Sequence, residues 1–159
     1  MSTVFARRFP ATDMSVGLVL ILVAIGAPRT VLADLGIVPP NSGAVYFVLA
    51  LAPFIVWLAV AVVRRSRRPF ADFVMVGVVY GLTLVGIHQV TWGVGRSWGY
   101  RPPAAAFEFA ARFDPGWYDI AARGYTCGIA MMIGVGTGLV VAVVAVLAGW
   151  VRGRTNRSA

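Results

Sequence analysis

The sequence predicts an all-α integral membrane protein: a bundle of four transmembrane helices, with short interfacial helices in the external loop between the third and the fourth. Composition is the first reason, because 59% of the 159 residues are hydrophobic and only 13% are charged. Soluble domains of this size carry about a quarter charged residues, so a water-soluble globule and a disordered chain are both excluded. Spacing is the second reason, because the apolar residues fall into four long runs.

Each apolar run matches the length of a transmembrane helix, which needs about 20 residues to cross the hydrocarbon core. We expect helices rather than strands, because an open strand would leave backbone groups unpaired in lipid. The expected spans are residues 14–33, 44–63, 72–92 and 127–150, within a single membrane domain that covers residues 1–159. Pro53 lies in the middle of the second span and should kink that helix, because proline removes a backbone donor.

The distribution of arginine predicts the orientation of these spans. Nine of the fourteen arginines lie in the N-terminal tail, in the loop at residues 64–71 and in the C-terminal tail. By the positive-inside rule these three segments are cytoplasmic, which leaves residues 93–126 as an external loop. The same arginines should attract anionic lipids at the cytoplasmic face, so the net charge of +8 does not indicate a nucleic-acid-binding protein. We therefore expect a multi-pass protein of a bacterial cytoplasmic (plasma) membrane with both termini inside.

The first apolar run has an alternative interpretation as a secretory signal peptide. Arg7 and Arg8 precede an apolar stretch that ends in the small residue Ala33, as a cleavable signal does. Cleavage there would leave three spans in the same orientation. We favour a retained first helix, because the apolar run continues past Arg29 to about Val38.

Paired glycines predict how the third and fourth spans pack. Gly77 and Gly81 lie one turn apart on the third span, and Gly134 and Gly138 lie one turn apart on the fourth. In lipid, helix association depends on close backbone approach, so small residues mark contact faces. We expect both stripes to face neighbouring helices, either in the same chain or in a second copy. The alternative is chance, because glycine is common in membrane helices.

Ionisable residues inside the spans are the first candidates for function. His88 and Gln89 lie about one turn from the outer end of the third span, and Arg29 lies at a similar depth in the first. His88 shares the face of Gly77 and Gly81, so it should point into the bundle. These side chains either line a polar path or are structural, with His88 neutral and bonded to a carbonyl or a tyrosine and Arg29 snorkelling to the surface.

The external loop is rich in aromatic residues and predicts two short helices. Pro102-Pro103 can open a helix that runs through Phe113, since proline is tolerated in a first turn. Asp114-Pro115 can cap and begin a second helix that ends near Gly124. We expect both helices to lie at the membrane surface as a lid over the bundle.

One stretch of this loop, residues 112–125, reads Arg-Phe-Asp-Pro-Gly-Trp-Tyr-Asp-Ile-Ala-Ala-Arg-Gly-Tyr. It resembles the first external loop of polyprenyl-phosphate-dependent membrane glycosyltransferases of the mannosyltransferase type. The resemblance implies that Asp114 corresponds to the catalytic aspartate of that family. Arg112 and Asp119 are further candidate polar residues of the loop; in the alternative, Arg112 and Arg123 only pair with Glu108 and Asp119. The stretch departs from the family in needing a one-residue gap after Tyr118 and in following the third span rather than the first.

The sequence lacks the motifs of other enzyme classes. The chain has one histidine, His88, and one cysteine, Cys127, which excludes a zinc-protease motif, an intrachain disulfide and a cysteine metal cage. We therefore predict no metal, no cofactor and no catalytic residue other than the candidate Asp114.

Three functions follow from these residues. The first is an accessory or structural subunit, or scaffold, that contacts other membrane proteins or a second copy of the chain. The second is a small oligomeric transporter or flippase with a polar path at His88 and Arg29. The third is a protein related to lipid-linked glycosyl transfer that uses Asp114.

Overall fold

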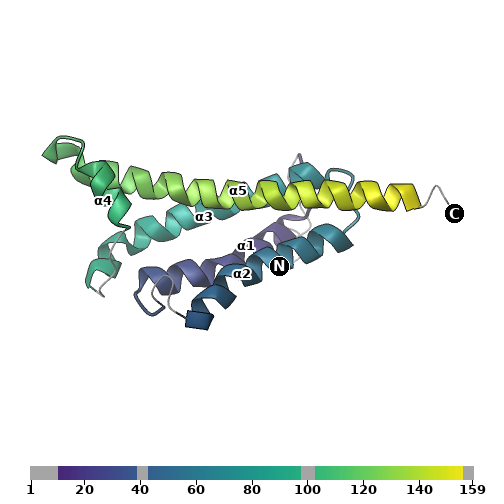
Figure 1. Cartoon of the computed structure of the whole chain (residues 1–159), viewed down its shortest axis with the longest axis horizontal. Helices are drawn as coiled ribbons and strands as arrows, with labels where there is room; N and C mark the ends of the chain where they lie inside the picture. The colour runs from purple at the N-terminus through teal and green to yellow at the C-terminus, as the bar shows by residue number, and fades with distance from the viewer. Residues whose placement is uncertain (1–10, 39–42, 98–102, 156–159) are drawn as a thin grey trace.

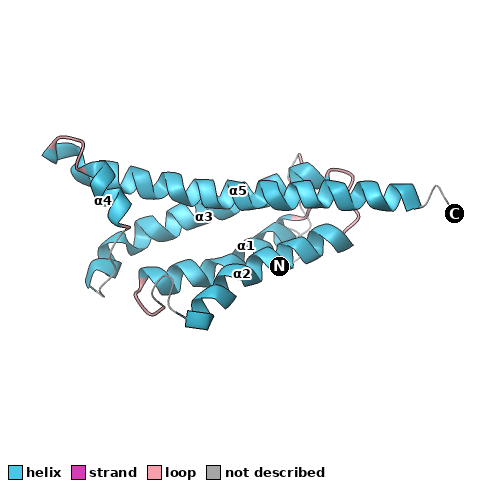
Figure 2. Cartoon of the chain, in the orientation of Figure 1, coloured by secondary structure: helices cyan, strands magenta, loops and turns pink. Residues whose placement is uncertain are grey.

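The computed structural model describes residues 11–38, 43–97 and 103–155, which form an antiparallel bundle of long helices (Figure 1). The long helices are α1 (Val16–Asp34), α2 (Gly43–Val63), α3 (Pro69–Ser97) and α5 (Tyr118–Thr155). A short helix, α4 (Ala104–Ala110), and a 3-10 turn, η1 (Pro115–Trp117), lie between α3 and α5. Figure 2 shows that loops join these helices in the described part of the chain.

The four long helices are each long and apolar enough to cross a membrane, which confirms the predicted number of apolar helices. Their outer surfaces carry large apolar side chains; Val48 and Ile55 of α2, for example, are 63% and 60% exposed. Scattered apolar side chains are common on soluble proteins, but contiguous exposed apolar surfaces are not. Together these features indicate a multi-pass membrane protein.

The core lies where the four long helices meet. α3 packs along most of α5, α1 packs on α3, and α2 packs against α1 and α5. Leu22, Trp57, Val76 and Val141, one from each long helix, are all buried here. The indole N–H of Trp57 donates to the carbonyl of Leu22 (3.0 Å), and its ring meets the Tyr80 ring edge-on, with 5.3 Å between centroids. The indole therefore ties α2 to α1 while remaining satisfied inside the bundle.

The helix bounds correct the prediction for the external loop. Residues 93–97 belong to α3, and residues 118–126 form the first turns of α5. A helical turn does begin at Pro115 after Asp114, but it leads directly into α5. The predicted end near Gly124 is therefore wrong, because Gly124 lies inside a helix. Glycine costs a helix about 1 kcal/mol relative to alanine. That is too little to end a helix whose first turns pack against α4.

The first short helix is closer to its prediction. α4 begins after Pro103, which occupies its N-cap position, and it ends before Phe113. Pro102, the arginines of residues 1–10 and Arg157 lie outside the described residues. α2 continues through Pro53, so the kink expected there stays a prediction.

A buried carboxylate joins the segment before α1 to the loop between α2 and α3. Asp72 of α3 is fully buried and accepts hydrogen bonds from the backbone N–H of Asp13 (2.7 Å) and the hydroxyl of Ser66 (2.6 Å). Asp13 in turn accepts the backbone N–H of Arg67 (2.8 Å). We call these four residues the Asp13–Asp72 cluster.

The last turns of α5 reach the same end of the bundle, because Arg152 donates to the carbonyls of Val62 and Arg64. The described parts of the three arginine-bearing segments therefore meet at one end, which we call the arginine-rich end. This agrees with an even number of crossings.

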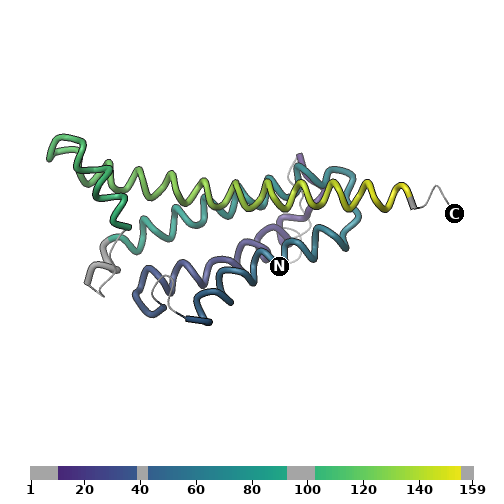
Figure 3. Tube along the Cα trace, in the orientation of Figure 1, coloured from purple at the N-terminus to yellow at the C-terminus, as the bar shows by residue number. Residues whose placement is uncertain are grey.

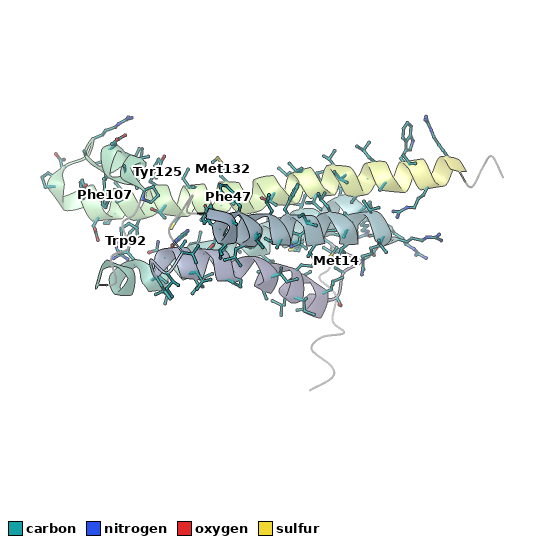
Figure 4. All side chains as sticks on the ribbon, turned by 60° about the horizontal axis from the view of Figure 1, so that its bottom comes forward. Met14, Phe47, Trp92, Phe107, Tyr125 and Met132 are labelled. Carbon is teal, nitrogen blue, oxygen red and sulfur yellow. The ribbon has the colours of Figure 1, made fainter. Side chains whose placement is uncertain are left out.

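At the opposite end, α4 folds back along the first turns of α5 (Figure 3). Trp92, Phe107 and Tyr125 gather there, while Met14 lies toward the arginine-rich end (Figure 4). Trp92 is buried against α4 and α5, and the Phe107 ring stacks on that of Tyr118 at 6.3 Å between centroids. Aromatic packing thus holds α4 against the bundle.

Candidate functional site

α1 and α3 bring a carboxylate and an imidazole together. Asp34 is the last residue of α1, and its Oδ2 lies 2.7 Å from Nδ1 of His88 in α3. Thr91, one turn further along α3, donates its hydroxyl to the same oxygen (2.6 Å). The side chain of Asp34 is 3% exposed and that of His88 is 20% exposed. Asp34 is thus a buried carboxylate whose hydrogen bonds come from one neighbouring helix.

A cavity of about 330 Å³ opens beside this pair, and we call it the Arg29 cavity. It lies between the four long helices, with Pro103 at one edge. Its polar lining residues are Arg29, Thr30 and Asp34 from α1, Tyr46 from α2, His88 from α3, and Tyr125 and Thr126 from α5. Its apolar lining residues are Ala33, Leu84, Ile129, Ala130 and Ile133. Charged and aliphatic groups thus line the same cavity.

Arg29 is half-buried at this cavity, with a neutral partner. Its Nη1 donates to the Tyr46 hydroxyl (3.1 Å), and its guanidinium carbon lies 5.8 Å from the centre of the Tyr46 ring. Among the described residues, no carboxylate lies within ion-pair distance of Arg29, because Asp34 bonds to α3 instead. The alternative of an arginine that snorkels to the surface stays a prediction.

Thr30 adds a buried hydroxyl that makes no hydrogen bond within the described residues. The residue is 4% exposed, and its hydroxyl has no hydrogen-bond partner among the described residues. Thr126, across the cavity, differs in donating its hydroxyl to the carbonyl of Ala122 (3.0 Å). A buried polar group without a partner costs about 1–3 kcal/mol, and an absent ligand or water is one explanation for such a group.

Gln89, predicted beside His88 as a polar candidate, contacts α5 rather than the cavity. Its amide N–H lies 3.0 Å from the sulfur of Cys127, and its oxygen accepts from Arg123 (3.4 Å). Arg123 also pairs with Asp119 at 3.4 Å and lies over the Trp92 ring at 5.0 Å. Gln89 and Asp119 therefore belong to a separate polar cluster between α3 and α5.

Asp114 and Arg112, the candidates in the external segment, are exposed and do not line the Arg29 cavity. Asp114 occupies the N-cap position of η1, but its side chain makes no capping hydrogen bond. The structure thus places Asp114 outside the group of polar side chains that converge between the helices.

The glycine stripes of α3 and α5 face each other within the chain. A Cβ built on Gly134 would lie 2.4 Å from the Cα of Gly81, and one built on Gly138 would lie 2.6 Å from the Cα of Gly77. Only a residue without a side chain fits either position. The stripes contact each other rather than a second copy, and His88 bonds to α1 although it shares their register on α3.

Four residues at or beside the cavity are not among the candidate site residues that the sequence predicts. Asp34, Thr30 and Tyr46 line the cavity, and Thr91 contacts Asp34. Each is an ordinary residue near the end of an apolar run, so only the packing of α1 against α2 and α3 reveals its partner. No family model, curated protein or solved structure matches the chain.

Proposed function

We propose that this chain is a small multi-pass membrane protein that binds an amphiphilic ligand in the Arg29 cavity, as a small transporter or flippase does. The mixed lining of that cavity is the observation that supports this function. Arg29, Asp34 and His88 provide polar contacts, while aliphatic side chains provide the rest of the wall. Ligand sites commonly have this form, with a mostly apolar wall and a few placed polar groups.

We place the arginine-rich end in the cytoplasm of a bacterial cell, following the positive-inside rule. Anionic lipids of the inner leaflet then meet residues 64–68, and the Arg29 cavity lies toward the outer leaflet. Most of the cavity wall is apolar, which suits a ligand that keeps its chain among the helices.

An accessory or scaffold role is the second candidate function. It is supported by exposed apolar side chains next to α4: Phe113, Trp117 and Ile120 are 47%, 61% and 61% exposed. Surfaces of this kind mark contacts with proteins or membranes. The glycine stripes give this role no support, because they are occupied within the chain.

Filling the cavity tests the first function. Ile129→Trp adds bulk to the cavity wall, and Met132→Trp adds the same bulk at a position that is 63% exposed on the same helix. We expect wild type and Met132→Trp to retain co-purifying lipid and to move labelled lipid between vesicle leaflets. Ile129→Trp should lose most of both. Equal lipid retention and flux in all three proteins would overturn the proposal.

His88→Ala separates the two functions. A carrier that uses the cavity should lose flux, since His88 lines it and holds Asp34. An accessory protein should instead keep a partner protein that co-purifies with wild type in gentle detergent. Retention of such a partner by both His88→Ala and Ile129→Trp, without lipid flux in wild type, would establish the accessory role.

A further inference from the structure

We propose that the head group bound in the Arg29 cavity is an oxyanion, a phosphate or a carboxylate, and that Arg29 binds it directly. The inference rests on the proposed function and names the chemical class of its ligand. The charges that face the cavity decide which head groups can enter it.

Arg29 has no carboxylate within ion-pair distance among the described residues. The carboxylate of Asp34 is held by His88 Nδ1 at 2.7 Å and the Thr91 hydroxyl at 2.6 Å, both on α3. Among the described residues, Arg29 interacts with the neutral hydroxyls of Tyr46 (3.1 Å) and Tyr80 rather than with a carboxylate. A guanidinium in a low-dielectric setting is costly without an anion. Its planar fork of donors fits a phosphate or a carboxylate in two places at once.

Neutral donors next to Arg29 suit the same ligand. Thr30 follows Arg29 in the chain, lines the cavity and has a buried hydroxyl with no partner. Tyr46 accepts from Arg29, which leaves its own O–H free to donate to an acceptor. An ammonium head group would be repelled by Arg29.

The apolar part of the site extends beyond the head-group position. A second cavity of about 370 Å³ shares Arg29 and Ile133 with the first. Its lining includes Leu51, Phe54 and Trp57, so it is mainly apolar and extends from the exposed side of α2 to the buried Trp57. A ligand with its anion at Arg29 can therefore place a hydrocarbon chain along Ile133.

Three probes distinguish the contribution of the head group from that of the acyl chain. They also show whether the anion belongs to a lipid or is free in solution. We would add phosphatidic acid, a diacylglycerol with the same acyl chains, or inorganic phosphate to the purified full-length protein in neutral detergent. Binding would be measured by ligand-dependent thermal stabilisation and by native mass spectrometry. We expect phosphatidic acid to bind at least about tenfold more tightly than diacylglycerol, the factor that corresponds to one charge-assisted hydrogen bond.

Arginine variants assign this preference to one side chain. Arg29→Gln should lose the preference for phosphatidic acid, and Arg29→Lys should keep part of it, because a lysine retains the charge but not the planar fork. Arg112→Gln is the matched control, since it removes one exposed positive charge outside the cavity. An equal loss in Arg29→Gln and Arg112→Gln would overturn the assignment.

The remaining outcomes are distinct. Equal binding of phosphatidic acid and diacylglycerol overturns the oxyanion but leaves amphiphile binding in place, whereas no binding of either lipid overturns the proposed function as well. Arg29-dependent binding of inorganic phosphate alone supports the oxyanion and gives it a water-soluble source.

If Arg29→Gln fails to fold, Tyr46→Phe removes one cavity hydroxyl but keeps the ring. It should weaken phosphatidic acid binding several-fold, and unchanged binding would count against the site.

Discussion

His88 and Asp34 form a polar pair 2.7 Å apart, although 54 residues separate them in the sequence. The contact joins α3 to the last residue of α1 beside the Arg29 cavity. Because Asp34 is almost fully buried, its carboxylate depends on donors from α3 rather than on water. The pair thus holds together two of the helices that form the cavity wall.

A double-mutant cycle should show that this pair stabilises the fold. Asp34→Asn and His88→Gln each remove one charged or titratable partner while keeping a similar shape. We expect the two changes to be non-additive by about 1 kcal/mol in the free energy of unfolding, the upper range for polar contacts between membrane helices. Unfolding in mixed detergent micelles measures it, and strictly additive effects would show that the pair is not coupled.

Close packing of α3 on α5 should make two glycines of α5 respond differently to the same substitution. A Cβ on Gly134 would lie 2.4 Å from backbone atoms of Gly81, whereas a Cβ on Gly136 meets nothing within 4 Å. We expect Gly134→Ala to destabilise the protein by about 1–3 kcal/mol through overpacking. Gly136→Ala should stabilise it by about 0.5–1 kcal/mol, because alanine is the better helix former. Similar unfolding midpoints for the two variants would contradict this packing.

Acid should weaken the Asp13–Asp72 cluster. The backbone N–H of Arg67 holds the pKa of Asp13 below its usual value, and the Ser66 hydroxyl and nearby Arg68 add to this against the opposing effect of burial. A carboxyl whose pKa is lower in the folded state stabilises that state above its unfolded pKa. This stabilisation is lost as the pH falls through the folded pKa, so wild type should lose thermal stability below about pH 4.

Two variants check that Asp13 is responsible for part of this loss. Asp13→Asn should flatten the fall in thermal stability with acid, because residue 13 then has no proton to gain. Asp114→Asn, a change at an exposed carboxyl without a capping hydrogen bond, should follow the wild-type profile. Parallel profiles for wild type and Asp13→Asn would remove the assignment to Asp13.

Cysteine labelling should report the proposed orientation. Gly116 and Gly153 are exposed positions at opposite ends of the bundle, and a side chain at either one meets nothing within 4 Å. In a Cys127→Ala background, Gly116→Cys should react with a membrane-impermeant maleimide in intact cells. Gly153→Cys should react only after permeabilisation. The reverse pattern would invert the orientation and place the Arg29 cavity toward the cytoplasm.

The sequence alone predicted the helical class and the number of long apolar helices, because both follow from local properties. An apolar run of about 20 residues must satisfy its backbone internally in lipid, and helix does this without a partner. The loop bounds were harder to predict. Gly124 indicates a helix end by its local preference, but packing against α4 keeps α5 helical through that position.

Some residues of the candidate site can be predicted from the sequence, and others are identified only by the packing of the helices. Arg29 and His88 stand out in the sequence because charged or titratable side chains are rare within apolar runs. Their partners, Tyr46 and Asp34, do not stand out, because each lies near the end of its run. Only the antiparallel packing of α1 against α2 and α3 determines which polar groups share a cavity, since that depends on the rotation and depth of each helix relative to the others.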